Sequence, residues 1–95
     1  MTYKIKFTPV SNKEWKKIDA SIRAQFRKKL EKVVLNPRIL KNKLSGYENI
    51  YKIKLKKSGF RIAYEVKDKE IVLLVISVGK RENNKIYKNL KDRIW

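Results

Sequence analysis

The sequence predicts an α+β domain in which a helical hairpin and a C-terminal helix pack on a four-stranded antiparallel sheet. Three observations predict it. Three apolar segments with strand patterning follow one another in the second half of the chain, two helical stripes precede them, and one helical stripe follows. Ninety-five residues without a repeat or a linker suit one domain, residues 1–95.

The first strand and the first helix are expected near the N-terminus. Apolar and polar residues alternate over residues 2–7, and Pro9 stops this strand, which we expect at an edge of the sheet. Ser11 followed by Glu14 three residues later is typical of a capping box, so a short helix carrying Trp15 should start there.

A second helix is predicted from Asp19 or Ser21 to the Asn36–Pro37 pair. Its apolar stripe has helical spacing and consists of Ile22, Phe26, Leu30, Val33 and Val34. The basic residues off this stripe are interpreted as a solvated face, with a secondary RNA contact as the sharper alternative. With this helix, Trp15 and Tyr64 are expected in the core.

The chain is organised around a predicted hairpin at residues 51–61. A four-residue loop from Lys56 to Gly59 would pair Ile53 with Ile62 and Lys54 with Arg61. Directly opposed cations destabilise a sheet, so the pair of Lys54 and Arg61 indicates a site for an anionic partner.

The remaining elements complete the sheet and cover it. Residues 60–66 form the second strand of the hairpin, residues 67–70 a turn, and residues 71–78 a central strand that is apolar on both faces. Gly79 is expected to break this strand. Asn83 could cap a last helix whose stripe is Ile86, Leu90 and Ile94.

Composition narrows the function to binding a polyanion. The chain has 26 Lys and Arg against 9 Asp and Glu, a net charge of +17, which favours nucleic acid over a small acidic substrate or a membrane surface. No signal-like or membrane-spanning run is present, and there is no Cys, so we expect the cytoplasm.

Several kinds of catalytic site are excluded or disfavoured. The absence of His removes a hydroxyl–His–Asp triad, and the three scattered glycines make no phosphate-binding loop. Glu65, Asp68 and Glu70 more plausibly shape a hairpin end than hold metal ions, so we expect neither a metal nor another cofactor.

A surface of Lys, Arg and Tyr can bind RNA, or can cleave it through the substrate's own 2′-hydroxyl. Cleavage needs a base, stabilisation of charge at phosphorus and a proton donor for the leaving oxygen. Neighbouring cations depress the pKa of a Lys or a Tyr, so Lys52, Lys54, Arg61 and Arg81 could adjust one another or Tyr87.

Five short motifs occur in an order that resembles the RelE toxins of the RelE/ParE superfamily, over essentially the whole chain. They are K-E-W-K-K-I at 13–18, N-K-L-S-G at 42–46, Y-K-I-K-L at 51–55, S-G-F-R at 58–61 and V-I-S-V-G-K-R-E at 75–82, followed by Tyr87. Their order and spacing carry the resemblance together.

The resemblance implies a toxin of a type II toxin–antitoxin system. It implies a metal-independent mRNA endonuclease that cuts in the A site of the 70S ribosome, against 16S rRNA, and is neutralised by a RelB-like antitoxin. Lys52 and Lys54 match lysines that activate the 2′-hydroxyl and stabilise charge, and Arg61 matches the arginine that holds the phosphate. Arg81 matches the general acid or leaving-group stabiliser, and Tyr87 the base-stacking tyrosine.

Some points stay open at this stage. Lys52 and Tyr87 compete for the role of general base. In the basic connector expected over residues 38–49, Ser45 replaces an arginine that RelE relatives carry before the glycine at Gly46. Further RNA contacts are expected from Lys41, Lys43, Lys56, Lys57 and Lys80. The alternative function is a non-catalytic relative, either a ParE-like gyrase inhibitor or an inactive RNA-binding module.

Overall fold

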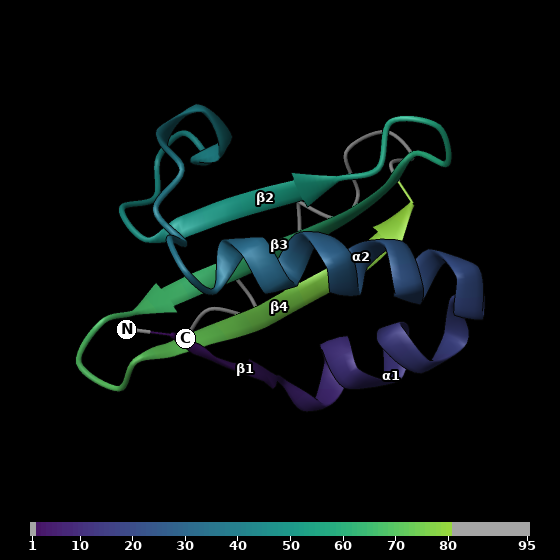
Figure 1. The fold of residues 1–95 in the computed structure, drawn as a ribbon, viewed down its shortest axis with the longest axis horizontal. Helices are drawn as coiled ribbons and strands as arrows, with labels where there is room; N and C mark the ends of the chain where they lie inside the picture. The colour runs from purple at the N-terminus through teal and green to yellow at the C-terminus, as the bar shows by residue number, and fades with distance from the viewer. Residues whose placement is uncertain (1, 81–95) are drawn as a thin grey trace.

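The structure is a computed structural model that describes residues 2–80. The predicted last helix, with Arg81, Asn83 and Tyr87, lies outside the described residues. The described elements follow one another along the chain as shown in Figure 1. They are β1 (Lys4–Phe7), α1 (Pro9–Lys17), α2 (Ala20–Val33), the 3-10 helix η1 (Leu40–Asn42), β2 (Ile50–Lys54), β3 (Phe60–Lys67) and β4 (Val72–Lys80).

The four strands form one sheet in the order β1-β4-β3-β2. The prediction of a wholly antiparallel sheet was wrong, because β1 pairs parallel to β4 with Lys4 beside Val72 and Phe7 beside Val75. The alternating pattern of residues 2–7 identifies a strand with two unlike faces, but alternation is the same in either direction. The expected place of this strand at a sheet edge is confirmed.

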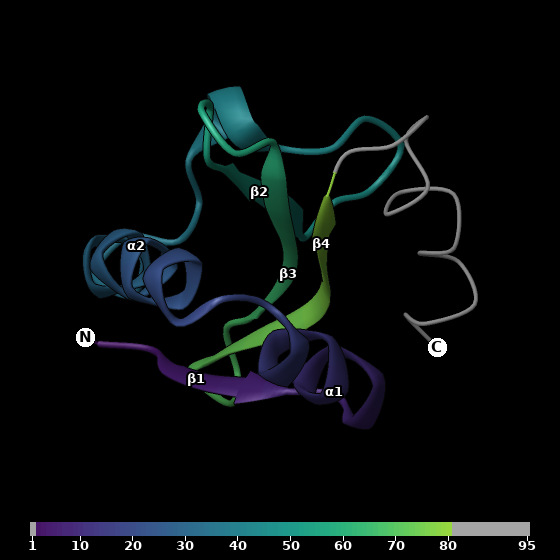
Figure 2. The same ribbon diagram turned by 90° about the vertical axis from the view of Figure 1, so that its right-hand side faces the viewer.

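The main core lies between α2 and one face of the sheet (Figure 2). Phe26 on α2 and Tyr64 on β3 are fully buried, as expected from the helical and strand patterns. Trp15 of α1 is partly buried and lies between the rings of Phe7 and Phe26, with centroid distances of 5.4 and 6.2 Å. The aromatic contacts therefore join α1, α2 and β1 at one end of the core.

The predicted start of α1 was wrong by three residues. The helix begins at Pro9, and the Oγ1 of Thr8 accepts a hydrogen bond from the backbone N–H of Ser11 at 3.1 Å. Proline suits the first helical position because its φ is already helical and no N–H is lost from the ladder. Ser11 instead belongs to the first turn of α1 and is buried, and its hydroxyl donates to the backbone oxygen of Val75 at 2.7 Å.

Glu14 also has a role different from capping. Its Oε1 accepts a hydrogen bond from the backbone N–H of Val78 at 3.2 Å. Together with the bond from Ser11 to Val75, this contact fixes α1 along the second half of β4. Asp19 does occupy the N-cap position of α2, as one of the two predicted residues, although its side chain makes no capping hydrogen bond.

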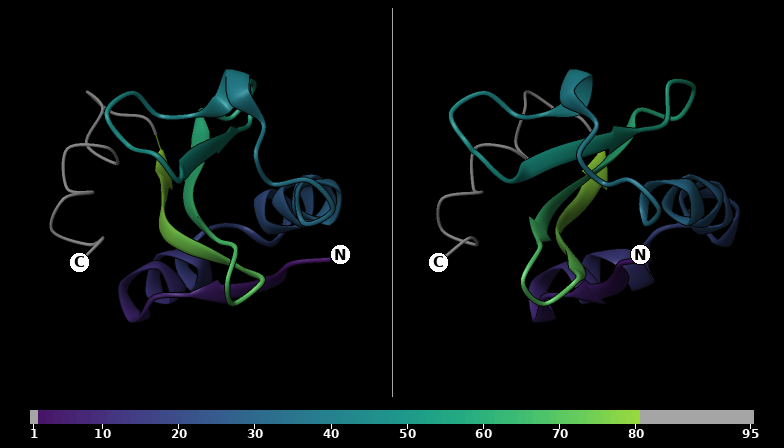
Figure 3. Two further views of the ribbon diagram at one scale, coloured as in Figure 1. Left: turned by 90° about the vertical axis from the view of Figure 1, so that its left-hand side faces the viewer. Right: turned by 60° about the vertical axis from the view of Figure 1, so that its left-hand side comes forward.

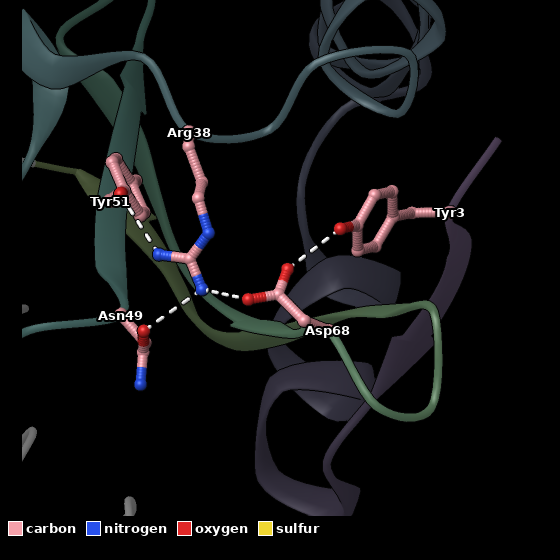
Figure 4. Close-up of polar contacts among 5 residues, drawn as sticks. All are labelled: Tyr3, Arg38, Asn49, Tyr51 and Asp68. Atoms are coloured by element: carbon pink, nitrogen blue, oxygen red, sulfur yellow. Dashed lines mark hydrogen bonds and ion pairs between the residues drawn. The ribbon is translucent and has the colours of Figure 1, made fainter. Parts of the chain in front are cut away.

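A polar network ties the connector after α2 (residues 34–49) to one end of the sheet (Figure 4). The guanidinium of Arg38 forms an ion pair with Asp68 and donates to the Oδ1 of Asn49 at 3.0 Å and to the hydroxyl of Tyr51 at 3.3 Å. The hydroxyl of Tyr3 donates to the other carboxylate oxygen of Asp68 at 2.7 Å. Hydrogen bonding from Arg38, and then from Tyr3, lowers the pKa of Asp68.

The prediction that Gly79 breaks the last strand was wrong. β4 continues to Lys80, and Gly79 is paired with Arg61 of β3. Glycine weakens a strand without ending it when both neighbouring peptides keep their hydrogen bonds. The extension continues the pairing of β3 with β4 as far as Phe60 and Lys80, next to the residues of the candidate site.

Candidate nucleic-acid interface

The predicted hairpin and its register are confirmed. Tyr51 pairs with Tyr64, Ile53 with Ile62, and Lys54 with Arg61. The backbone N–H of Leu55 donates to the oxygen of Phe60 at 2.9 Å, and the N–H of Gly59 donates to the oxygen of Leu55 at 2.9 Å. Gly59 has a φ of 75°, a left-handed conformation that glycine adopts without strain, so the turn fixes the register.

Lys52, Lys54 and Arg61 lie on the sheet face that points away from α2. Ile53 and Ile62, which alternate with them, are buried in the core against α2. Lys54 is exposed, whereas Lys52 and Arg61 are half-buried. Neither lysine forms an ion pair with any residue of the described chain. We call these three residues the cationic strip.

Gly79 leaves an open position at the end of the cationic strip. Its register places it beside Arg61 on the same face, on the side opposite Lys54. A Cβ built on Gly79 would meet no described heavy atom within 4 Å. Glycine inside a strand often marks a place where a ligand or another backbone approaches closely. Among the described residues, nothing would crowd a phosphate on the β4 side of Arg61.

The same sheet face has a small apolar base next to the cationic strip. Ile50, Ala63 and Ile76 are buried there, and Leu44 and Tyr47 of the connector pack against them. The register of β3 and β4 shifts between Ala63 and Tyr64, which gives β4 one extra residue at this point. Sequence analysis predicted burial on both faces of β4 but missed Tyr47, whose only signal is an aromatic residue in a basic connector.

The remaining predicted RNA-binding lysines lie outside the cationic strip. Lys56 and Lys57 are exposed in the β2–β3 turn, Lys41 lies in η1, and Lys43 forms an isolated bridge to Tyr51 at the β2 edge. Lys80 points to the opposite face from the cationic strip, because its ammonium lies 5.7 Å from the centroid of the Phe60 ring. The structure thus brings Lys52, Lys54 and Arg61 together, and leaves Lys80 apart. Arg81 and Tyr87 lie outside the described residues.

The acidic residues of the β3–β4 turn form ion pairs with neighbouring basic residues. Asp68 is paired with Arg38, and Glu70 forms an ion pair with Lys67 at 3.9 Å. Within residues 2–80, no group of three His, Cys, Asp or Glu side chains is placed to hold a metal ion. No helix in that part of the chain has the length and apolar character needed to cross a membrane.

Comparison with known proteins identifies the class. A family model described as the ParE toxin of the type II toxin–antitoxin system, parDE, matches residues 5–85. The mRNA interferase toxin RelE of Escherichia coli strain K12 is 46% identical over 94 residues, which are 99% of each chain. The mRNA interferase RelE of Shigella flexneri matches with the same identity and coverage.

Solved structures agree with the sequence comparison. A doubly substituted E. coli toxin RelE in the free state superposes with a TM-score of 0.92 at 44% identity, covering 100% of both chains. The toxin chain of the intact E. coli RelBE toxin–antitoxin complex gives a TM-score of 0.81 at 48% identity, covering 84% of this chain and 98% of that one.

This fold, with a basic face on its sheet, defines a small toxin of a type II toxin–antitoxin system. Full-length identity to RelE narrows the assignment: the chain belongs to the RelE toxins of the RelE/ParE superfamily.

Proposed function

We propose that this toxin cleaves mRNA in the A site of the translating ribosome and so inhibits translation. Full-length relatives at 46% identity are mRNA interferases, and the chain is accordingly an endoribonuclease. The observation that carries the proposal is the pairing of Lys54 with Arg61 beside the open position at Gly79. Two adjacent cations on a rigid sheet provide a place for one scissile phosphate.

The proposed reaction is transfer of a phosphodiester within the RNA. The 2′-oxygen attacks the adjacent phosphorus, and the bond from phosphorus to the 5′-oxygen breaks. The proton of the 2′-hydroxyl passes to a base on the protein, and the leaving 5′-oxygen takes up a proton. The products are a 2′,3′-cyclic phosphate and a 5′-hydroxyl, so the step consumes no water and no metal ion.

The proposed roles are those that the resemblance to RelE toxins implies, and the positions of Lys52, Lys54 and Arg61 on the cationic strip are consistent with them. Arg61 holds the phosphate, because a guanidinium matches two of its oxygens and lies between Lys54 and the open position. Lys54 stabilises the charge that develops at phosphorus. Lys52, two residues back on the same face, competes with Tyr87 for the proton of the 2′-hydroxyl. Arg81 serves the leaving oxygen in this proposal.

The proposed partners are the ribosome with its 16S rRNA, the mRNA and a RelB-like antitoxin. Support for an antitoxin comes from the solved RelBE complex, whose toxin chain shares this fold. Translating ribosomes place the action of the toxin in the cytoplasm. The net charge of +17 fits both an RNA-rich target and an acidic inhibitor.

A ParE-like action on gyrase is the second candidate, because the matching family model is named for ParE. We give more weight to the full-length relatives, because they are named as mRNA interferases and match 99% of this chain at 46% identity. The combination of Lys52, Lys54 and Arg61 on one face is expected of an RNA-cleaving member and serves no evident purpose in a gyrase inhibitor.

Translating ribosomes programmed with a defined mRNA provide the direct test. Primer extension should map cuts within the A-site codon, and end analysis should find a cyclic phosphate. Arg81→Ala and Tyr87→Phe should each reduce cutting while leaving the thermal unfolding midpoint within the range of the wild type. Cutting of naked RNA alone, or inhibition of gyrase without RNA cutting, would contradict the proposal. A chelator that leaves ribosomes intact should not change the rate.

A further inference from the structure

A second basic site lies on the α2 side of the sheet. It is a groove of about 400 Å³ between the second half of α2, η1 and the end of β2. Five of its lining residues are lysines: Lys29, Lys32, Lys41, Lys54 and Lys56. None of the described lining residues is acidic, and all five lysines are exposed. We call this site the lysine groove.

The walls of the lysine groove are held in place by packing. Val33 of α2 and Ile53 of β2 belong to the main core, and Ile39 packs against it. The ammonium of Lys29 donates to the backbone oxygen of Lys54 at 2.9 Å, which joins α2 to the end of β2. The groove is therefore set by the fold, and none of its five lysines forms an ion pair within the described part of the chain.

The lysine groove and the cationic strip lie on opposite faces of the sheet, and the edge strand β2 separates them. β2 is the outermost strand, and η1 lies beyond its edge in the views of Figure 3. The connector covers only the beginning of this edge, through the bond from Leu44 to Ile50 and the bridge of Lys43 to Tyr51. The end of β2, at Lys54, has no further strand beside it among the described residues.

The chemistry of the groove selects a phosphate backbone. Lysine ammonium groups bind phosphates as point charges, and a row of them tracks a strand without reading its sequence. No described lining residue is aromatic, so bases have no stacking surface there. An acidic helix would also be attracted, but continuity favours RNA, because Lys54 belongs both to the cationic strip and to the lysine groove.

We propose that single-stranded RNA bound on the cationic strip continues over the open end of β2 into the lysine groove, where its backbone is held without sequence preference. This inference rests on the proposed function, since it extends the path of the same substrate. It assigns Lys29 and Lys32, which sequence analysis interpreted as part of a solvated helix face, to substrate binding.

Length dependence of RNA binding tests this path. Fluorescence anisotropy would compare 2′-O-methyl oligonucleotides of about 4 and about 12 nucleotides, a span that single-strand grooves cover. For the wild type, the longer oligonucleotide should bind more tightly. In Lys32→Gln/Lys41→Gln, two lost phosphate contacts should reduce the salt slope by about 1.4 and weaken the longer oligonucleotide roughly 25-fold at ~0.1 M salt. Binding of the shorter one should change little.

The matched control is Lys13→Gln/Lys17→Gln, which removes two exposed lysines of α1 that do not line the groove. A smaller loss in this control than in the groove variant supports the path. Equal losses would mean that only the overall charge matters, and no loss in the groove variant would remove the path altogether. Normal RNA binding with weakened binding of an acidic amphipathic peptide would assign the groove to a protein partner and overturn the proposal.

These readouts separate the inference from the proposed function. The oligonucleotides cannot be cleaved, so groove binding is measured whether or not the toxin cuts on ribosomes. Failure of A-site cutting with an intact length effect would reject only the proposed function. A-site cutting without a length effect would reject only the lysine groove.

Discussion

Lys54 and Arg61 are direct cross-strand partners, and Arg61 is paired on its other side with Gly79. Three cross-strand neighbours on β2, β3 and β4 are thus two cationic residues and one glycine without a side chain. Opposed cations cost the sheet free energy, of the order of 0.2–1 kcal/mol for such a pair. Retaining them side by side on one face of the sheet is understandable when an anion binds between them.

Lys54→Ala should therefore lose activity without losing stability. Removing a group that stabilises the developing charge at phosphorus typically lowers the rate by about 10²–10³-fold. The free energy of unfolding should stay the same or rise slightly, because the repulsion from Arg61 is relieved. Single-turnover cleavage on programmed ribosomes and urea unfolding measure the two effects.

Lys13→Ala is the control for this substitution, since Lys13 is an exposed lysine of α1 away from the cationic strip. It should cut at nearly the wild-type rate. A Lys54→Ala variant that is unfolded, or that cuts as fast as this control, would remove Lys54 from the site.

Substitutions at Gly79 should affect the stability of the fold and the binding of substrate differently. Its φ lies outside the left-handed region and a Cβ would meet no described heavy atom within 4 Å, so Gly79→Ala should raise the free energy of unfolding by about 0.5–1 kcal/mol. Gly79→Val should also fold, but its branched side chain would occupy the space beside Arg61. We expect Gly79→Val to raise the substrate concentration needed for half-maximal cleavage far more than Gly79→Ala does. Equal kinetics of the two variants would show that this position stays clear of RNA.

Glu14 should contribute to stability through the main chain of β4. Glu14→Ala leaves the backbone N–H of Val78 without its carboxylate acceptor, which should cost about 1–3 kcal/mol in urea unfolding. Glu14→Gln retains an acceptor oxygen at the same reach and should recover much of that loss. If the glutamine variant is as unstable as the alanine variant, the negative charge rather than the hydrogen bond to Val78 is what matters.

The pairing of Arg38 with Asp68 predicts a dependence of stability on acid. The pKa of Asp68 is lower in the folded chain than its ordinary value of 3.8, so the folded state favours the carboxylate. Its contribution is complete above that ordinary value and is lost as the pH falls through the lowered pKa. The difference in unfolding midpoint between wild type and Asp68→Asn should be constant at neutral pH and shrink below about pH 4. A difference that is unchanged at low pH would exclude this linkage.

Sequence reasoning succeeded where a local pattern has one physical solution. The turn from Lys56 to Gly59 fixes the hairpin register, and the register alone places Lys54 opposite Arg61. The stripe of α2 was predicted correctly because Phe26 and Leu30 recur with helical spacing and are buried. These features depend on neighbours within a few residues along the chain.

Features that depend on distant partners were missed. The direction of β1 is set by its pairing with β4, and the positions of Ser11 and Glu14 by hydrogen bonds to Val75 and Val78. A capping-box spacing is the same whether the side chains cap a helix or reach a strand more than sixty residues away. The lysine groove likewise combines residues of α2 and β2, and no pattern in the sequence indicates that these two elements lie together.

The parallel pairing of β1 with β4 has a consequence for synthesis. Lys4 leaves the ribosome early, but its partner Val72 emerges only when most of the chain has been made. The β2–β3 hairpin can form as soon as it emerges, since its contacts are local. Until β4 has been synthesised, β1 has no strand to pair with and its backbone hydrogen-bonding groups stay unpaired. For the same reason α1 cannot pack on β4 until that strand has emerged. Folding is therefore completed from the C-terminal side, and a truncated nascent chain lacks both the finished sheet and the strand that flanks Arg61.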